Sequence, residues 1–314
     1  HAFELDPRHV RKPLVRALVE IGVNRASLGV QDFSHHVQQA IGRIQPLGIV
    51  ADAVATLRDA GIDKINIDLM YGLPKQTERD VRRSIALADS LRPQRLALFG
   101  YAHVPWFKAN QRLIDETALP GPEQRLAQAE TARETLISLG YVPIGLDHFA
   151  RPDDELARAA ASGRLHRNFQ GYTTDEADAL VGFGASSISK LPQGFAQNAA
   201  DVGAYSEAIS ARRLATVKGI AFSSDDRLRA RIIERLMCDF AVDVEAVASQ
   251  MGQARIEEFD SDIESLTPLK TEGVLEIAGR RVAMTEKGRP FVRLAAAAFD
   301  AYFKRGQARH SAAV

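Results

Sequence analysis

The stretch "KINIDLMYGLPKQTERDVRRSIALADSL" (residues 64–91) decides the fold class, because it contains one complete strand–turn–helix unit. Residues 64–70 are rich in apolar and β-branched side chains, which is typical of a buried strand. A Gly-Leu-Pro turn follows, and Thr77 stands where an N-cap would begin a helix over residues 78–91. A buried strand that leads into an amphipathic helix predicts a βα unit.

The same unit recurs on both sides of this stretch. Strand-like runs occur at residues 2–5, 25–30, 95–100 and 141–149, and helical periods separate them. Strands that alternate with helices form parallel sheets. We therefore expect an α/β fold, with a parallel sheet that is either open or closed into a barrel, and we assign residues 1–221 to this first domain.

The pattern changes at Ser223. A capped helix over residues 223–240 is followed by two further helical runs, the second at residues 263–273, then by a hairpin that turns at residues 278–280 and by a last helix. This order predicts a mostly helical, winged-helix-like domain over residues 222–314. Such domains often bind DNA, but acidic residues are mixed among the basic ones here.

The composition argues against several classes of partner. The 314 residues contain 40 Lys and Arg and 40 Asp and Glu, so the formal net charge is zero. A neutral chain has no general attraction for nucleic acid or an anionic membrane, and no apolar run approaches the roughly 20 residues that span a bilayer. We expect a cytoplasmic protein that binds neither. The one cysteine, Cys238, supports neither a disulfide nor a cysteine metal site within the chain.

Polar residues end the predicted strands. In a parallel sheet the carboxyl ends of the strands meet at one edge, where the active sites of α/β barrels lie. The polar residues at or near these ends are Glu4, Gln31, Asp68, His103 and Asp147. Polar residues that merely mark strand ends are the alternative for each one. Arg43 could bind a carboxylate through both ends of its guanidinium, although a solvated arginine is the more common case.

The stretch "GLDHFARPDDEL" (145–156) starts as the end of a strand and continues into a turn. We expect residues 147–149 to line the site and Pro152-Asp153-Asp154 to cap the following helix.

Six segments together resemble the oxygen-independent coproporphyrinogen III oxidases, a radical S-adenosylmethionine family. These segments are "GVQDF" (29–33), "NIDLMYGLPKQT" (66–77), "YAHVP" (101–105), "DHFARPDDEL" (147–156), "HRNFQGYTT" (166–174) and "FAQN" (195–198). The resemblance implies a partial (β/α)6 barrel, here without its first strands. The family holds a [4Fe–4S] cluster on three cysteines that this sequence lacks. We therefore expect the cluster ligands upstream of His1, and expect this chain alone to be inactive.

The resemblance also implies binding residues, while no catalytic residue is assigned. The family uses two molecules of S-adenosylmethionine, and the implied contacts are Glu4, Gln31, Arg43, Asp68, Ala102 and Ile188. Residues near the strand ends are candidates for contacting the substrate, and arginines suit its carboxylates. These candidates are His103, Asp147, His148, Arg151 and Arg167.

The implied reaction converts two propionate side chains of coproporphyrinogen III into vinyl groups, with release of carbon dioxide, in anaerobic haem biosynthesis. It needs a reductant such as a flavodoxin or a ferredoxin, and we expect a monomer when the protein is complete. A haem-binding or haem-chaperone relative without decarboxylase activity is the main alternative. A regulator that acts through the C-terminal domain is the second.

Overall fold

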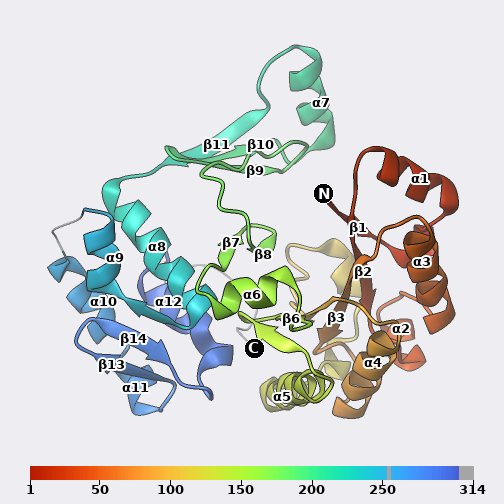
Figure 1. The fold of residues 1–314 in the computed structure, drawn as a ribbon, viewed down its shortest axis with the longest axis horizontal. Coiled ribbons are helices and arrows are strands. Elements are labelled where there is room, and N and C mark those ends of the chain that lie inside the picture. Colours follow the sequence, from red (N-terminus) through yellow and green to blue (C-terminus); the bar gives the residue numbers. More distant parts are fainter. Residues whose placement is uncertain (253–255, 304–314) are drawn as a thin grey trace. The chain divides into compact units, whose positions relative to one another are not determined.

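The structure is a computed structural model that describes residues 1–252 and 256–303. The chain divides into two compact units, one of residues His1–Ser162 and one that begins at Gly163 (Figure 1). Residues 163–221 therefore group with the C-terminal residues in the fold. The boundary at residues 221/222 remains a prediction of where the C-terminal domain begins.

The first unit is built on one six-stranded sheet with the order β1-β2-β3-β4-β6-β5. Strands β1 to β4 pair in parallel, which confirms the predicted α/β class. The strands are β1 (Ala2–Leu5), β2 (Arg25–Gln31), β3 (Lys64–Tyr71), β4 (Arg95–Gly100), β5 (Val142–Ile144) and β6 (His148–Ala150).

Helices connect the parallel strands and pack along the sheet (Figure 1). Thr77 caps α4 in a capping box with Asp80, as its place in the sequence predicts. The helices of this unit are α1 (Lys12–Glu20), α2 (His35–Ala40), α3 (Leu47–Asp59), α4 (Glu78–Ser90), α5 (Pro122–Ser138) and α6 (Glu155–Ala161). Three short 3-10 helices accompany them: η1 (Pro7–His9), η2 (Ala109–Leu113) and η3 (Glu116–Ala118).

The core of this unit lies between the sheet and the helices. Along β3, Ile65 and Ile67 are fully buried, and they pack in one cluster with Leu57 of α3 and Ile85 of α4. Each such side chain contributes about 1.5–3 kcal/mol by burial. The alternate residues of β3 point to the opposite face of the sheet, and that face is polar.

The end of the sheet differs from the prediction. The run at residues 141–149 reads as one strand, but it forms a hairpin of two short strands, β5 and β6, that turns at residues 145–147. Gly145 takes a left-handed conformation (φ 56°) that glycine adopts without strain. Because the chain reverses, β6 runs antiparallel to β4 and inserts between β4 and β5.

The second unit begins with two antiparallel arrangements. β7 (His166–Asn168) pairs with β8 (Gly171–Thr173), and a three-stranded sheet of order β11-β10-β9 follows. Its strands and the helix that crosses between two of them are β9 (Ile188–Leu191), β10 (Gly194–Asn198), α7 (Val202–Ser210) and β11 (Thr216–Ala221).

The C-terminal part has the predicted helices and hairpin. The hairpin turns at residues 279–280, as expected, and β12 adds a third strand to it. The helical run predicted at residues 263–273 is instead two short helices, α10 and α11, interrupted at Ser265-Leu266. The elements are α8 (Ser224–Asp239), β12 (Ala241–Asp243), α9 (Val244–Gln250), η4 (Glu257–Phe259), α10 (Asp260–Glu264), α11 (Thr267–Thr271), β13 (Leu275–Ala278), β14 (Arg281–Met284), η5 (Arg289–Phe291) and α12 (Val292–Ala298).

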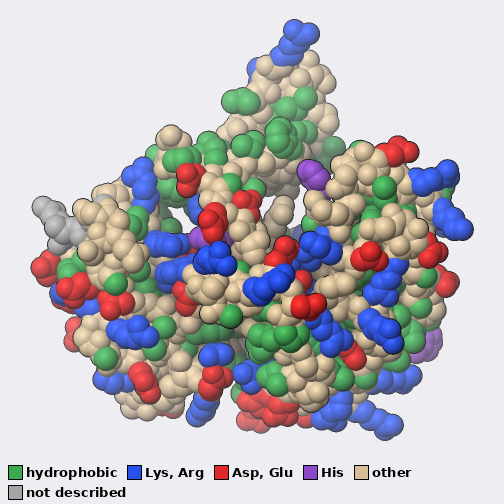
Figure 2. Space-filling view, in the orientation of Figure 1, with side chains coloured by type: hydrophobic (Ala, Val, Ile, Leu, Met, Phe, Trp, Pro, Cys, Tyr) green, Lys and Arg blue, Asp and Glu red, His purple; other side chains and the backbone are tan. Residues whose placement is uncertain are grey.

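The surface carries both signs of charge. Figure 2 shows acidic and basic side chains interspersed over the face in view, in keeping with the balanced composition. Among the described helices, none combines the length and the apolar character needed to cross a bilayer.

Candidate functional site

The face of the sheet that points away from the helices is polar. Parallel sheets are usually buried and apolar on both faces, and the face toward the helices follows that rule. On the other face, the strand alternation places Ser27 and Gln31 of β2 and Asn66 and Asp68 of β3. A polar sheet face suits a polar ligand.

Asp68 is the centre of a hydrogen-bonded cluster on this face. Ser27 Oγ donates to Asp68 Oδ2 (2.9 Å), and Asn66 Nδ2 donates to Asp68 Oδ1 (2.7 Å) and to Ser27 Oγ (2.8 Å). Burial raises the pKa of the Asp68 carboxyl, and the charge of Glu4 acts in the same direction, while the two hydrogen bonds oppose the rise. Asn66 Oδ1 is buried and accepts no hydrogen bond from the described residues, so an acceptor atom is left for a ligand.

Strand register places two more predicted residues near Asp68. Glu4 of β1 pairs with Ser27 of β2, whose hydroxyl binds Asp68. On the other side, Asp68 pairs with Ala97 of β4, and Ala97 pairs with His148 of β6. Directly paired residues point to the same face, so His148 shares the polar face with Asp68.

Gln31 and Arg43 form a second group, at the carboxyl end of β2. Gln31 has a left-handed backbone (φ 73°), and the pairing with β3 shifts register between Gly29 and Gln31. Arg43 Nη2 donates to the Gly29 carbonyl (2.8 Å) and lies 3.3 Å from Asp6 Oδ2. Burial lowers the pKa of the Arg43 guanidinium. Its Nε is buried without a hydrogen-bond partner among the described residues, which leaves a donor for an anion.

Asp6 holds this second group in place. Arg8 Nη2 and Nε donate to its carboxylate at 2.6 and 3.0 Å. The hydrogen bond from the Arg8 side chain lowers the pKa of Asp6 to about 2, with a smaller contribution from the charge of Arg43. Asp6 therefore stays ionised and orients the guanidinium of Arg43.

The loop after β4 carries Ala102 and His103. His103 Nδ1 lies 3.2 Å from the Tyr101 hydroxyl, and its Nε2 lies 3.0 Å from Glu116 Oε1. Gln111 Nε2 donates to the Ala102 carbonyl (2.9 Å), and its Oε1 accepts from the Val104 amide (2.6 Å). These contacts fix the loop at the carboxyl edge of the sheet, beside the strand ends.

Asp147 and His148 lie at the tip of the β5–β6 hairpin. His148 Nδ1 is 2.7 Å from Asp147 Oδ1, and its ring meets Phe99 edge to face at 5.7 Å between centroids. The Asp147 carbonyl accepts from the Leu98 amide (2.7 Å), which joins the tip to β4. The hairpin therefore keeps Asp147 and His148 at the same edge as Asp68, although the chain reverses there, whereas Phe149, which we also expected to line the site, packs in the hydrophobic core.

Arg151 lies at the opposite edge of the sheet. Because β6 runs backwards, its far end approaches the start of β4, where the Arg151 amide donates to the Gln94 carbonyl (2.9 Å). The guanidinium donates to Asp89 Oδ1 (2.6 Å) and stacks 4.0 Å from the centre of the Tyr141 ring. This place does not support a contact between Arg151 and a ligand at the carboxyl edge.

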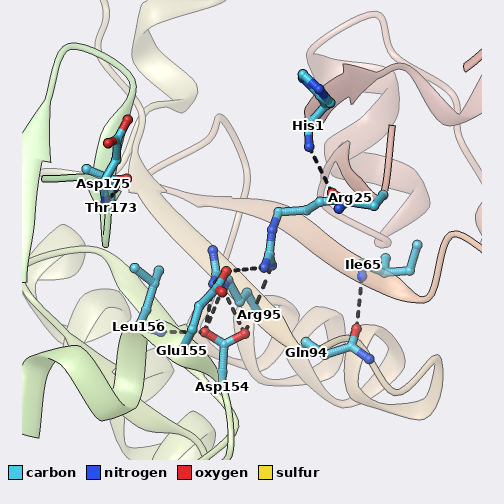
Figure 3. Close-up of polar contacts among 11 residues, drawn as sticks. His1, Arg25, Ile65, Gln94, Arg95, Asp154, Glu155, Leu156, Thr173 and Asp175 are labelled. Carbon is cyan, nitrogen blue, oxygen red and sulfur yellow. Dashed lines mark hydrogen bonds and ion pairs between the residues drawn. The ribbon is translucent and has the colours of Figure 1, made fainter. Parts of the chain in front are cut away.

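The next residues behave as helix-capping residues, as the sequence predicts, and also enter an ion-pair network. Asp154 is the N-cap of α6 and accepts from the Leu156 amide (2.8 Å). Its carboxylate also accepts from Arg95 Nε (2.9 Å), and Glu155 Oε1 binds Arg25 Nη2 (2.5 Å) and Arg95 Nη2 (3.0 Å) (Figure 3). Local sequence patterns gave no sign of these long-range pairs, nor of the roles of Ser27 and Asn66.

Arg167 and Ile188 belong to the second unit. Arg167 lies 5.6 Å from the Tyr172 ring, and its Nε is buried without a hydrogen-bond partner in the described chain. Ile188 lines an apolar cavity of about 300 Å³ together with Phe169, Phe195 and Ile220. Phe195 meets Phe169 and Phe222 edge to face, at 5.1 and 4.7 Å between centroids.

No metal centre is formed by the side chains of residues 1–252 and 256–303: no group of three or more His, Cys, Asp or Glu residues is placed to hold an ion. Cys238 is buried in α8, where burial raises the pKa of its thiol to about 12.

Two family models match the chain. The model of the Radical SAM superfamily matches residues 2–88, and the model of the HemN C-terminal domain matches residues 222–291. The first covers β1 to β3 with most of α4, and therefore both groups of polar residues on the sheet.

The proteins reported next are similar to this chain, and all of them are named as coproporphyrinogen III oxidases. The oxygen-independent coproporphyrinogen III oxidase of Bradyrhizobium diazoefficiens is 50% identical, over 100% of this chain and 69% of that protein. The enzyme of the same name from Paracoccus denitrificans is 45% identical over the same shares. The structure of coproporphyrinogen III oxidase (HemN) from Escherichia coli, a radical SAM enzyme, matches with a TM-score of 0.90 and 38% identity, over 96% of this chain and 70% of that one.

Proposed function

The chain belongs to the oxygen-independent coproporphyrinogen III oxidases, a family of radical S-adenosylmethionine enzymes, and on that premise we propose that its sheet face binds S-adenosylmethionine for the oxidative decarboxylation of coproporphyrinogen III to protoporphyrinogen IX. The observation that carries the proposal is the polar face with buried, unmatched atoms on Asn66 and Arg43. A buried donor and a buried acceptor without partners are costly unless a ligand satisfies them.

The two groups suit opposite ends of S-adenosylmethionine. The Asp68 carboxylate accepts hydrogen bonds, as a ribose or an amino group requires, and Glu4 adds a second carboxylate nearby. Arg43 has the fork geometry that matches the methionyl carboxylate. The Nε of Arg43 has no hydrogen-bond partner among the described residues, so this N–H group can donate to a ligand.

Gln31 and Ala102 supply the remaining contacts on this unit. Gln31 offers an amide at the carboxyl edge, and Ala102 offers backbone on the loop fixed by Gln111. Ile188 contributes an apolar wall in the second unit, where the ring-lined cavity suits a flat base. We assign two molecules of S-adenosylmethionine, with the Ile188 cavity as a part of the second site.

The [4Fe–4S] cluster that the family implies does not fit the residues present. Such a cluster takes cysteine thiolates as ligands, and the one cysteine, Cys238, is a buried thiol with a raised pKa. S-adenosylmethionine, when bound and reduced by one electron that these residues do not supply, would provide the radical that removes a hydrogen atom from the substrate's propionate.

The chain's own contribution is to bind, to orient and to exclude water. Asp68 and Arg43 fix the two ends of the ligand, so that its reactive centre meets the substrate in one geometry. The carboxylates act as acceptors and need no proton transfer of their own. Reactive intermediates demand a dry site, because they attack whatever lies near them.

The substrate candidates at the carboxyl edge are His103, Asp147 and His148, and Arg167 is the candidate in the second unit. A propionate carries a negative charge that an arginine or a protonated histidine pairs with. Asp147 binds His148 at Nδ1 and thereby orients the ring. Arg151 is left out of this set, because Asp89 and Tyr141 already hold it at the other edge.

Product analysis tests the proposal. The complete, cluster-loaded enzyme is given coproporphyrinogen III, S-adenosylmethionine, a one-electron donor that starts cleavage of S-adenosylmethionine, and an electron acceptor that takes the electron released on decarboxylation, all without oxygen. We expect protoporphyrinogen IX, carbon dioxide and 5′-deoxyadenosine. Haem binding without any decarboxylated product would instead identify a haem-binding relative and overturn the proposal.

A further inference from the structure

Gln31 is held in a strained turn by buried residues on both sides of it. Its φ of 73° is rare for residues other than glycine. The Asp32 amide donates to the Val30 carbonyl across it (3.0 Å), which makes a γ-turn of the uncommon, strained kind. Such a conformation persists only where the surroundings enforce it, and it is concentrated at functional sites.

The chain before Gln31 is fixed by buried amides. Gln45, which is fully buried, donates through Nε2 to the Gly29 and Val30 carbonyls (3.2 and 3.0 Å). Arg43 Nη2 shares the Gly29 carbonyl. Gln38 in turn holds Gln45, because its Oε1 accepts from the Gln45 amide (2.9 Å). The side chain of Gln45 thus satisfies carbonyls at the irregularity in β2.

The chain after Gln31 is fixed by Asp32, which is fully buried. One carboxylate oxygen accepts from the Ser34 amide, and the other accepts from Gln76 Nε2 (2.7 Å). The Ser84 hydroxyl of α4 also bonds to this carboxylate, while its oxygen accepts from the Phe33 amide (2.9 Å). Every partner of the carboxylate is a donor.

Gln76 carries the connection to the next strand. Its Nε2 also donates to the Met70 carbonyl (2.8 Å), and its Oε1 accepts from the Leu73 amide (3.1 Å). Met70 lies two residues after Asp68 on β3. Asp32 therefore joins the turn that presents Gln31 to the strand end that presents Asp68, although its own side chain is out of reach of any ligand.

We propose that Asp32 is a positioning residue for S-adenosylmethionine, which sets the distance between the contacts on β2 and those on β3. This inference rests on the proposed function, since it takes Gln31, Arg43 and Asp68 as the binding residues. A carboxylate is required at residue 32 because three donors converge there. An asparagine of the same shape would turn its NH2 group toward one of these donors. The NH2 group and that donor would then face each other, and neither would have an acceptor.

The test is Asp32→Asn in the complete, cluster-loaded enzyme. We expect the Kd for S-adenosylmethionine, and for its uncleavable relative S-adenosylhomocysteine, to rise about tenfold, the change that 1.4 kcal/mol produces. The KM for S-adenosylmethionine should rise in parallel, while the KM for coproporphyrinogen III stays within about twofold of the wild type.

Asp89→Asn is the matched control. Asp89 also accepts from two donors, Arg151 and Tyr141, but at the opposite edge of the sheet. Both variants should lower the melting temperature, and only Asp32→Asn should weaken ligand binding. Equal Kd values for the two variants would overturn the inference.

A second variant separates positioning from general damage. If Asp32→Asn fails to fold, Gln45→Met removes the donor to the Gly29 and Val30 carbonyls instead, and the same rise in Kd is expected. An unchanged Kd in Gln45→Met contradicts the inference. Wild-type enzyme that does not bind S-adenosylmethionine would contradict the proposed function itself.

Discussion

The amino and carboxyl edges of the first sheet both carry charged residues, but these residues differ in the partners that they bind. At the amino edge, Arg25 and Arg95 meet Asp154 and Glu155 in a set of ion pairs, although Arg25 Nη1 is buried without a hydrogen-bond partner among the described residues and lies 4.0 Å from Asp154 Oδ2. At the carboxyl edge, Asp68 accepts from Ser27 and Asn66, and Arg43 binds Asp6, while Arg43 Nε and Asn66 Oδ1 have no hydrogen-bond partner within the described chain. The comparison teaches that an unmatched buried atom marks a candidate binding site only together with other features, here the predicted strand-end residues that gather at the carboxyl edge.

The largest expected effect is at the amino edge. Asp154→Ala removes a buried N-cap and the partner of two arginines, and leaves those arginines with Glu155 alone. Burial already lowers the pKa of Arg25, and the charge of Arg95 lowers it further. We expect a loss of about 3 kcal/mol in the free energy of unfolding, because a buried charge is left unpaired. Urea unfolding measures it.

Glu155→Gln is the companion variant. Glu155 is more exposed than Asp154, so its loss should cost less, about 1 kcal/mol. Equal losses in the two variants would contradict the assignment of Asp154 as the centre of the network.

The next effect is at the carboxyl edge and concerns binding rather than stability. Asp68→Asn should weaken S-adenosylmethionine binding by about 100-fold, because the buried carboxylate proposed to accept the ligand's hydrogen bonds is replaced. The melting temperature should fall only slightly at pH 7, because the amide loses one hydrogen bond from Ser27 or Asn66 but avoids the cost of burying a carboxylate. Calorimetric titration and thermal unfolding of the same sample give both values.

The difference in stability between the wild type and Asp68→Asn should depend on pH, because the pKa of Asp68 is raised. The neutral carboxyl contributes stability that is fully present below the ordinary pKa of 3.8 and is lost as the pH rises through the raised value. The stability of the wild type relative to Asp68→Asn should therefore decline over that interval. A relative stability that rises with pH there would show that the carboxylate form is the favoured one.

A third test compares two arginines that the sequence alone does not separate. Arg151→Met should cost about 2 kcal/mol in stability, through the loss of the Asp89 pair and the stacking on Tyr141. The KM for coproporphyrinogen III should stay unchanged. Arg167→Met should raise that KM, because Arg167 has a donor without a described partner. A raised KM in Arg151→Met would restore Arg151 to the substrate site.

The smallest effect concerns Asp6. Its pKa is lowered to about 2, chiefly by the Arg8 hydrogen bond, so its contribution to stability is present above pH 3.8 and disappears as the pH falls through 2. Solvent reaches this pair, and we expect only about 1 kcal/mol. The free energies of unfolding of the wild type and of Asp6→Asn, measured as the pH is lowered, should become equal below pH 2. A difference that persists there would assign the effect of Asp6 to packing.

Much of the sheet could be predicted from the sequence, because local periodicity reports which face of a strand or helix is buried. The strands before β5 and the capping box of α4 follow from it. The β5–β6 hairpin does not, since residues 141–149 have the same apolar character whether or not the chain reverses at Gly145.

The candidate site divides in the same way. The strand-end residues Asp68 and Gln31 stand out locally, but Arg95 is 59 residues from Asp154 and Arg25 is 130 residues from Glu155, and no local pattern reports such pairs. The place of Arg151 could not be predicted for a related reason. It depends on the direction of β6, which the sequence left open.

The insertion of β6 between β4 and β5 also affects how the protein is made. β4 cannot gain its outer neighbour until residues 148–150 have been synthesised, some fifty positions after β4 itself. A nascent chain that has left the ribosome only as far as α5 would expose the unpaired backbone of β4 for several seconds at ordinary translation rates. Chaperone capture should therefore peak on ribosome-bound chains that end shortly before this strand, and release should follow its emergence.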